Sequence, residues 1–346
     1  MKREQLLEAI GGVDESLLIE TEQPVRAKRI PVGRLVLVAA IIAALAMTVA
    51  GATELFFNLK ASNGATVENL ATGMGTFIYS NDSIFYGTAG KIIQYDTAGN
   101  VLREYPLESE DVVPHYMFAM EGAIVYTDGY LGLNIMPLDG SAPQTVFADM
   151  DMTYVYVDGN QLYTTNGTEM LTRVDLLTGE TTDLLENVST YYVDDNYIYA
   201  VQASREYCYF RSQKGSDTFE KIPLTFDPNK VVANGEDLYF CQWIEEDDRE
   251  EGQLPYQVNR VQDGVITPLP IYTWFYQVLD GCVLYRDDNY KLKSYDLDTG
   301  ETETLQKNVF DFSVVGGRYV CIERFNQAPV LLDWTTGETV KLPIDK

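Results

Sequence analysis

Few side chains in this sequence have the types and spacing that catalysis requires. The single histidine, His115, lies in a linker between two predicted strands, without a neighbouring group to orient it as a general base. The sequence contains no GxSxG elbow, no phosphate-binding loop and no pair of histidines spaced for zinc. We therefore expect a protein without catalytic residues and without a cofactor.

The four cysteines are Cys208, Cys241, Cys282 and Cys321, each within an apolar segment, and their spacings are 33, 41 and 39 residues. Zinc sites use close cysteine pairs, which are absent here. Disulfides form in oxidising compartments, but these spacings follow the period of the repeat described below. Because that places each cysteine in a different unit, we expect four buried free thiols.

One segment combines carboxylates with aromatic rings. It carries Glu245, Glu246, Asp247 and Asp248 and is followed by two further glutamates at 250 and 251. Carboxylates beside aromatic rings can hold a sugar, a peptide or Ca²⁺, and two carboxylates at a suitable separation cleave glycosides. The alternative is a solvated acidic loop without a ligand. The candidate ligand-binding residues are Trp243, Glu245, Glu246, Asp247, Asp248, Tyr256, Tyr272 and Trp274.

These residues lie within a repeated pattern that begins near Thr76 and recurs roughly every 40 residues, a period typical of propeller blades and solenoid repeats. Each unit opens with a strand, a tight turn and a second strand rich in aromatic residues. Asn234-Gly235 and Asp280-Gly281 are two of these turns. Such dipeptides adopt the positive φ that two-residue hairpin turns need.

A second hairpin follows in each unit. Its clearest copies share the pattern D-x-x-T-G-E-T and span residues 174–181, 295–302 and 332–339. Each unit therefore holds four antiparallel strands, which is typical of a β-propeller blade. We count seven units, starting near residues 75, 116, 152, 189, 231, 275 and 309, and six or eight blades are the alternatives because the fourth and fifth units are irregular.

The sequence thus predicts an all-β protein with a β-propeller over residues 75–346. In such a fold, the loop between the second and third strands of a blade lies on the same side as the inter-blade connections. The acidic segment occupies that loop in the fifth unit, and Tyr272 and Trp274 follow on the next connection. We therefore expect the candidate residues to share one face.

The second unit resembles a known repeat. Residues 124–128 (IVYTD), followed by residues 137–141 (PLDGS), look like the repeat of low-density-lipoprotein-receptor-type (YWTD-like) propellers, and bacterial propellers of unknown function carry related repeats. The other units lack the Thr-Asp pair, and the receptor family usually has six blades. The resemblance implies binding of a protein or another ligand without catalysis.

Residues 35–52 form an uncharged apolar run long enough to span the hydrocarbon core of a membrane as a helix. We predict one transmembrane helix over residues 32–53. Basic residues precede the run and Glu54 follows it, so the positive-inside rule places the N-terminus in the cytoplasm and the propeller outside the cell. The alternative is a signal peptide cleaved after Ala52, which leaves the propeller outside as well.

Three further expectations concern partners. Residues 1–29 form a cytoplasmic stub with two short amphipathic segments, similar to the leaders of membrane proteins of the anti-sigma-factor type, and residues 54–74 form a stalk. Residues 1–53 contain six basic and six acidic residues and are neutral, so residues 54–346 carry the whole net charge of −27, which disfavours nucleic acid. We expect a surface-anchored binding module for a protein, peptide or glycan. The alternatives are a transmembrane sensor with a cytoplasmic partner and a glycan-active enzyme.

Overall fold

The computed structural model describes residues 76–344 except for 121, 129–131, 149–152, 159–160, 166–168, 176–177, 179, 204–206, 247–248 and 250–252. Within these residues, 28 strands form seven four-stranded antiparallel sheets. The described part of the chain has no helix of the length and apolarity that a membrane span requires. The predicted stub (1–29), transmembrane helix (32–53) and stalk (54–74) lie outside the described residues.

Each sheet is one blade and consists of four consecutive strands. Blade 1 comprises β1 (Phe77–Ser80), β2 (Ser83–Thr88), β3 (Lys91–Asp96) and β4 (Val101–Pro106). Blade 2 comprises β5 (His115–Met120), β6 (Ala123–Thr127), β7 (Gly132–Pro137) and β8 (Gln144–Ala148). Blade 3 comprises β9 (Thr153–Asp158), β10 (Gln161–Thr165), β11 (Leu171–Asp175) and β12 (Thr181–Leu185). Blade 4 comprises β13 (Val188–Val193), β14 (Tyr197–Gln202), β15 (Cys208–Gln213) and β16 (Glu220–Pro223).

The remaining three blades follow the same order. Blade 5 comprises β17 (Pro228–Asn234), β18 (Asp237–Trp243), β19 (Tyr256–Gln262) and β20 (Val265–Tyr272). Blade 6 comprises β21 (Tyr276–Leu279), β22 (Cys282–Arg286), β23 (Lys291–Asp296) and β24 (Thr302–Lys307). Blade 7 comprises β25 (Val309–Val315), β26 (Tyr319–Arg324), β27 (Gln327–Asp333) and β28 (Thr339–Lys341).

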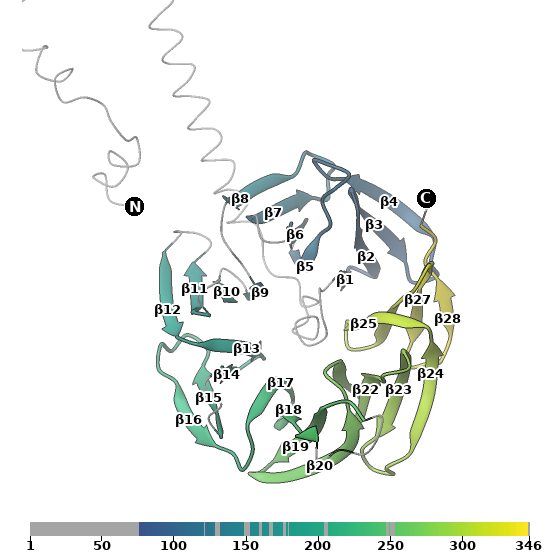
Figure 1. The fold of residues 1–346 in the computed structure, drawn as a ribbon. Helices are drawn as coiled ribbons and strands as arrows, with labels where there is room; N and C mark the ends of the chain where they lie inside the picture. Colours follow the sequence, from purple (N-terminus) through teal and green to yellow (C-terminus); the bar gives the residue numbers. More distant parts are fainter. Residues whose placement is uncertain are drawn as a thin grey trace, which may run out of the picture. The chain divides into compact units, whose positions relative to one another are not determined.

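The blades surround a central axis, with the first strand of each blade innermost and the fourth at the rim (Figure 1). Their first strands begin close to the seven predicted starting points. The structure therefore confirms the predicted seven-bladed propeller and excludes the alternatives of six or eight blades.

Turn residues fix the hairpins as the sequence predicted. Between β1 and β2, Asn81 and Asp82 have φ values of 50° and 56°, the left-handed pair that a two-residue turn requires. In the second hairpin of blade 6, Oδ1 of Asp296 accepts hydrogen bonds from the amides of Asp298 and Thr299, and Gly300 has a φ of 72°. The pattern D-x-x-T-G-E-T thus encodes a closed turn.

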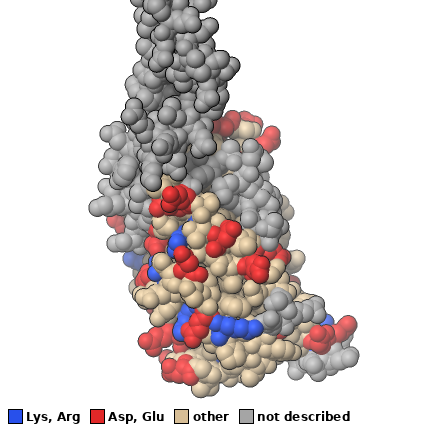
Figure 2. All heavy atoms as spheres, turned by 90° about the vertical axis from the view of Figure 1, so that its left-hand side faces the viewer, with Lys and Arg blue, Asp and Glu red and all other residues tan. Residues whose placement is uncertain are grey.

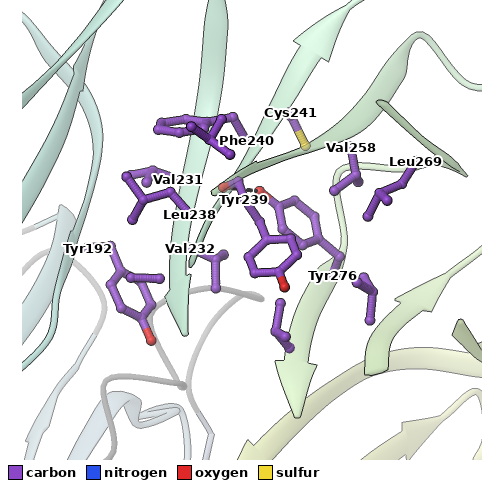
Figure 3. Packing of buried hydrophobic residues seen from close by; sticks show 14 of the residues in the cluster. Tyr192, Val231, Val232, Leu238, Tyr239, Phe240, Cys241, Val258, Leu269 and Tyr276 are labelled. Carbon is purple, nitrogen blue, oxygen red and sulfur yellow. Dashed lines mark hydrogen bonds between the residues drawn. The ribbon is translucent and has the colours of Figure 1, made fainter. Parts of the chain in front are cut away.

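Neighbouring blades pack through apolar side chains, and tyrosine hydroxyls cross between them. The largest described cluster joins blades 4, 5 and 6 and includes Tyr239, Phe240 and Tyr276 (Figure 3). The hydroxyl of Tyr276 donates to the carbonyl oxygen of Tyr239 over 3.0 Å. Tyrosine suits these layers because its ring fills the apolar space while its hydroxyl finds a backbone acceptor.

The ring closes between blades 7 and 1 without exchange of strands among the described residues. Leu342, which follows β28, is fully buried in a cluster with Phe77 and Tyr95 of blade 1. The hydroxyl of Tyr95 donates to the carbonyl oxygen of Pro343 over 2.8 Å. Closure therefore depends on the last residues of the chain packing against the first blade.

The alternating strand directions give the propeller two different faces. We call one the loop face, formed by the connections between second and third strands and by the inter-blade connections, such as residues 244–255 and 273–275. We call the other the turn face, formed by the two hairpin turns of each blade, such as residues 81–82 and 297–301. The longest connection between two strands, residues 244–255, belongs to the loop face.

The cysteines lie in four different blades and are free, as predicted. Cys208, Cys241 and Cys321 are buried, whereas Cys282 at the start of β22 is only partly buried, so the prediction of four buried thiols was wrong for this residue. Burial raises the pKa of Cys241 to about 12, which keeps that thiol protonated and unreactive at neutral pH.

His115 is the first residue of β5 and not part of a linker. Its burial lowers the pKa of the imidazole. Its carbonyl oxygen accepts a hydrogen bond from the hydroxyl of Thr127 over 3.0 Å. The backbone of His115 thus pairs the two inner strands of blade 2.

Candidate functional site

The insertion in blade 5 leaves the propeller at the loop face, as predicted. It joins β18 to β19, and the amide of Ile244 donates to the carbonyl oxygen of Pro255 over 2.7 Å. This bond closes the base of the insertion, so the hairpin beneath it keeps its register with Trp243 opposite Tyr256.

Three of the predicted site residues form one aromatic stack, which we define as Trp243, Tyr256 and Trp274. The ring centroids of Trp243 and Tyr256 lie 5.2 Å apart, and those of Tyr256 and Trp274 lie 4.9 Å apart. Both pairs are edge-to-face, the arrangement that aromatic quadrupoles favour. Trp243 is nevertheless 45% exposed, so the stack offers a ring to solvent.

The other predicted site residues do not belong to the aromatic stack. Glu245 lines the hollow described below, and Glu246 is exposed on the same loop. Tyr272 ends β20, and its hydroxyl oxygen accepts a hydrogen bond from Nε2 of Gln257 over 3.4 Å. Asp247 and Asp248 lie outside the described residues, so the prediction of a Ca²⁺ site on this loop stays a prediction.

A hollow of about 700 Å³ opens on the loop face between blades 4 and 5. Its volume lies within the range typical of small-molecule sites. Its lining residues include Trp243, Trp274 and Glu245, which were predicted. The residues of the hollow that were not predicted include Ser189, Gln202, Tyr207, Asp227, Asn229 and Gln242.

Two of the unpredicted residues occupy equivalent positions. Gln202 ends the pairing of β14 with β13, opposite Val188, and Gln242 lies at the same place in blade 5, opposite Pro228. A blade-by-blade alignment would have detected this pair of glutamines. Tyr207 is 62% exposed on the neighbouring loop of blade 4, and only the packing of two blades brings it to the hollow.

A buried lysine lies beneath the aromatic stack. Lys230 in β17 is only 6% exposed, and its Nζ donates a hydrogen bond to the carbonyl oxygen of Trp274 over 2.9 Å. The same Nζ lies 4.8 Å from the ring centroid of Tyr276. Burial lowers the pKa of Lys230 to about 8. Lys230 therefore holds the backbone of Trp274 in place.

Further charged groups lie on the same inner side of blades 6 and 7. Burial raises the pKa of Asp311 to about 7, and nearby Glu323 acts in the same direction while Arg286 and Lys230 oppose it. The guanidinium of Arg286 lies 3.7 Å from the ring centroid of Phe275. None of these groups is among the described residues that line the hollow.

A second hollow, of about 610 Å³, lies on the turn face between the same two blades. Three tyrosines and several carboxylates line it, but its one arginine, Arg211, lies over the ring of Tyr197 and pairs with Glu220 over 3.0 Å. Neither Tyr197 nor Tyr199 belongs to the strongly exposed aromatic residues. The loop-face hollow is therefore the stronger candidate, because it presents exposed rings.

The acidic character of the chain is visible on the rim. Seen from the side of blades 3 and 4, Asp and Glu side chains are spread over the described surface, with few basic ones among them (Figure 2). Basic residues of these blades form ion pairs, such as Arg173 with Asp217 at 2.8 Å. Within the described part of the chain, no three His, Cys, Asp or Glu side chains are grouped to hold a metal ion.

Comparisons with known proteins identify the fold. No protein-family model matches the chain, and no curated protein matches it significantly. The resemblance to low-density-lipoprotein-receptor-type propellers therefore stays an expectation. Among solved structures, 726 chains match, which is expected for a common architecture.

Three of these structures illustrate the likeness. The computationally designed Ika8 protein has a TM-score of 0.52 and 13% identity, covering 81% of this chain and 88% of its own. The tricorn protease has a TM-score of 0.58 and 12% identity, with coverages of 82% and 35%. PorZ, a surface component of the type-IX secretion system of Porphyromonas gingivalis, has a TM-score of 0.55 and 10% identity, with coverages of 83% and 39%. The chain thus spans less than half of the latter two proteins, and these likenesses show the propeller fold alone.

Proposed function

We propose that this protein is a membrane-anchored, non-catalytic binding module that holds its ligand on the loop face of the propeller, outside the cell. The observation that carries the proposal is the hollow between blades 4 and 5, with exposed aromatic rings at Tyr207 and Trp243. A propeller supports this role because its rigid blades present variable loops on one face.

Exposed aromatic rings favour the loop face as the binding face. A large aromatic ring exposed to water does not contribute to stability through burial in the core. Such rings often supply much of the binding energy at interfaces. Tyr207 and Trp243 lie on different blades yet line the same hollow. One ligand in the hollow would therefore bury both rings at once.

The placement of the propeller outside the cell rests on the sequence. The apolar run at residues 35–52 is long enough for a membrane span, and the basic residues precede it. A protease added to intact cells should therefore degrade the propeller. Protection of the propeller until the cells are lysed would contradict this placement.

Photo-crosslinking tests the choice of face. A photoreactive phenylalanine analogue is placed at position 207, or at position 265 as the matched control, because Val265 is 64% exposed on the rim strand β20. The proposal expects a crosslinked product from intact cells at position 207 and none at position 265. Equal products at both positions, or none at 207, would contradict it.

A further inference from the structure

We infer that the hollow between blades 4 and 5 binds a neutral saccharide. This inference rests on the proposed function and adds the chemical class of the ligand. It depends on three properties of the hollow: side chains with planar polar groups, exposed aromatic rings, and the lack of lysine and arginine among the described residues that line it.

Planar polar groups line the hollow from both blades. Gln202 comes from blade 4, and Asn229 and Gln242 come from blade 5, with the carboxylates of Asp227 and Glu245 beside them. Amide and carboxylate groups present two polar atoms side by side. That spacing matches pairs of neighbouring hydroxyl groups on a sugar ring, which donate and accept hydrogen bonds together.

Two of the amides are already oriented by the protein. Nε2 of Gln202 donates to the carbonyl oxygen of Glu186 over 2.7 Å, and Oε1 of Gln242 accepts a hydrogen bond from Nδ2 of Asn259 over 3.3 Å. Each of these bonds uses one end of its amide and fixes the plane of the group. Orientation before binding lowers the entropic cost of holding a ligand.

The aromatic rings supply the apolar part of the site. A sugar ring has an apolar face of C–H groups, which packs against the face of an aromatic ring while the hydroxyl groups point outward. Trp243 is 45% exposed, and Tyr207 is 62% exposed on the opposite blade. The edge-to-face contacts of the aromatic stack and the bond from Lys230 to Trp274 hold the Trp243 side in place.

The charge of the hollow disfavours other classes of ligand. Among the described residues that line it, none is lysine or arginine, whereas two are carboxylates. An anionic ligand such as a phosphate would therefore lack a cationic partner and meet repulsion. An extended peptide would bind a free sheet edge, but the hollow is lined by loops and strand ends. A neutral ligand rich in hydroxyl groups fits these constraints.

Calorimetric titration of the full chain tests the inference. The probes are neutral tetrasaccharides of β-linked glucose, β-linked N-acetylglucosamine, β-linked xylose and α-linked glucose, together with a proline-rich peptide and an oligolysine peptide. We expect at least one tetrasaccharide to bind with a Kd of about 1 mM or tighter. Tyr207→Ala and Asn229→Ala should each weaken that binding roughly tenfold or more.

Matched controls distinguish the site from the surface. Tyr290→Ala removes another exposed aromatic side chain, 49% exposed in the loop of blade 6, and should leave the affinity unchanged. Circular dichroism confirms that each variant is folded. Binding of no tetrasaccharide, or equal binding by wild type and Tyr207→Ala, would overturn the inference. If only a peptide binds, and Tyr207→Ala weakens that binding, the inference of a saccharide ligand is overturned but the proposed function stands.

Discussion

Individual residues show how this propeller accommodates polar groups in its interior. Lys230 and Asp311 lie on the innermost strands of blades 5 and 7. Burial lowers the pKa of Lys230 and raises the pKa of Asp311, so it favours the neutral form of each side chain. Lys230 has a defined structural task, since it donates to the carbonyl oxygen of Trp274. The sequence predicted the strands of these blades but not their buried charged positions, because burial depends on how the blades pack in the closed ring.

Asp311 makes the stability of the protein depend on pH. Its pKa is about 7 in the folded state, against 3.8 for an ordinary aspartate such as that of the unfolded chain. Between about pH 4 and about pH 7 the folded protein therefore retains a proton that the unfolded chain has lost. The free energy of unfolding should therefore fall as the pH rises from about 4 to about 7, by at most about 4 kcal/mol from this group. Asp311→Asn should reduce that fall.

Urea unfolding of wild type and variant at several pH values measures this effect. Glu301→Gln, a change at an exposed carboxylate, serves as the control for removing one negative charge. Lys230, Arg286 and Glu323 face the same region and remain in both proteins. If the free energy of unfolding of Asp311→Asn and of Glu301→Gln depends on pH as in wild type, Asp311 does not cause the pH dependence.

At the scale of elements, blade 5 adds an insertion, residues 244–255, to a regular hairpin. Its base is closed by the bond between Ile244 and Pro255, and the strands on either side keep the register of the other blades. The sequence predicted the insertion and its face because the turn chemistry of neighbouring strands is local. The sequence did not predict Tyr207 or Asn229, because they reach the hollow only through packing between blades.

Removing the insertion should separate stability from binding. Replacing residues 245–254 by Asn-Gly provides a short hairpin turn between Ile244 and Pro255. The free energy of unfolding should change by less than about 1 kcal/mol, because the excised segment does not include the core strands. Saccharide binding should weaken roughly tenfold or more, since the deletion removes Glu245 and the rest of the loop that follows Trp243.

The matched control is Asp263→Asn, which alters a hairpin turn of the same blade on the turn face. It should leave both stability and affinity close to wild type. Calorimetric titration and urea unfolding check both variants. Unchanged affinity in the protein without the insertion would show that the binding site lies elsewhere.

At the scale of the whole molecule, the propeller depends on closure between its first and last blades. The repeated turns predicted seven blades and their boundaries, because each hairpin is encoded by a few adjacent residues. The contacts that close the ring were not predicted, because they join residues that lie far apart in the sequence. Leu342 and Pro343 close the ring by contacting blade 1, where Pro343 accepts the hydrogen bond of Tyr95.

Leu342→Ala tests this closure. Leu342 is fully buried between blades 7 and 1, so its truncation should lower the free energy of unfolding by about 3 kcal/mol. Val265→Ala removes a 64% exposed side chain and should change it by less than about 0.5 kcal/mol. Urea unfolding compares the two. A loss for Leu342→Ala no larger than for Val265→Ala would show that the ring does not close through this contact.

Tryptophan fluorescence tests the central claim, that the loop-face hollow of blades 4 and 5 is the binding site. The chain has three tryptophans, of which Trp243 and Trp274 line the hollow, while Trp334 lies in a hairpin turn of blade 7 on the turn face. A Trp334→Phe variant therefore reports on the hollow alone. Titrated with the tetrasaccharide that binds by calorimetry, it should show a saturable change in emission with the same Kd. The variant with Phe at positions 243 and 274 should show none. A change carried by Trp334 alone, or saturable binding without any change from Trp243 and Trp274, would contradict the account.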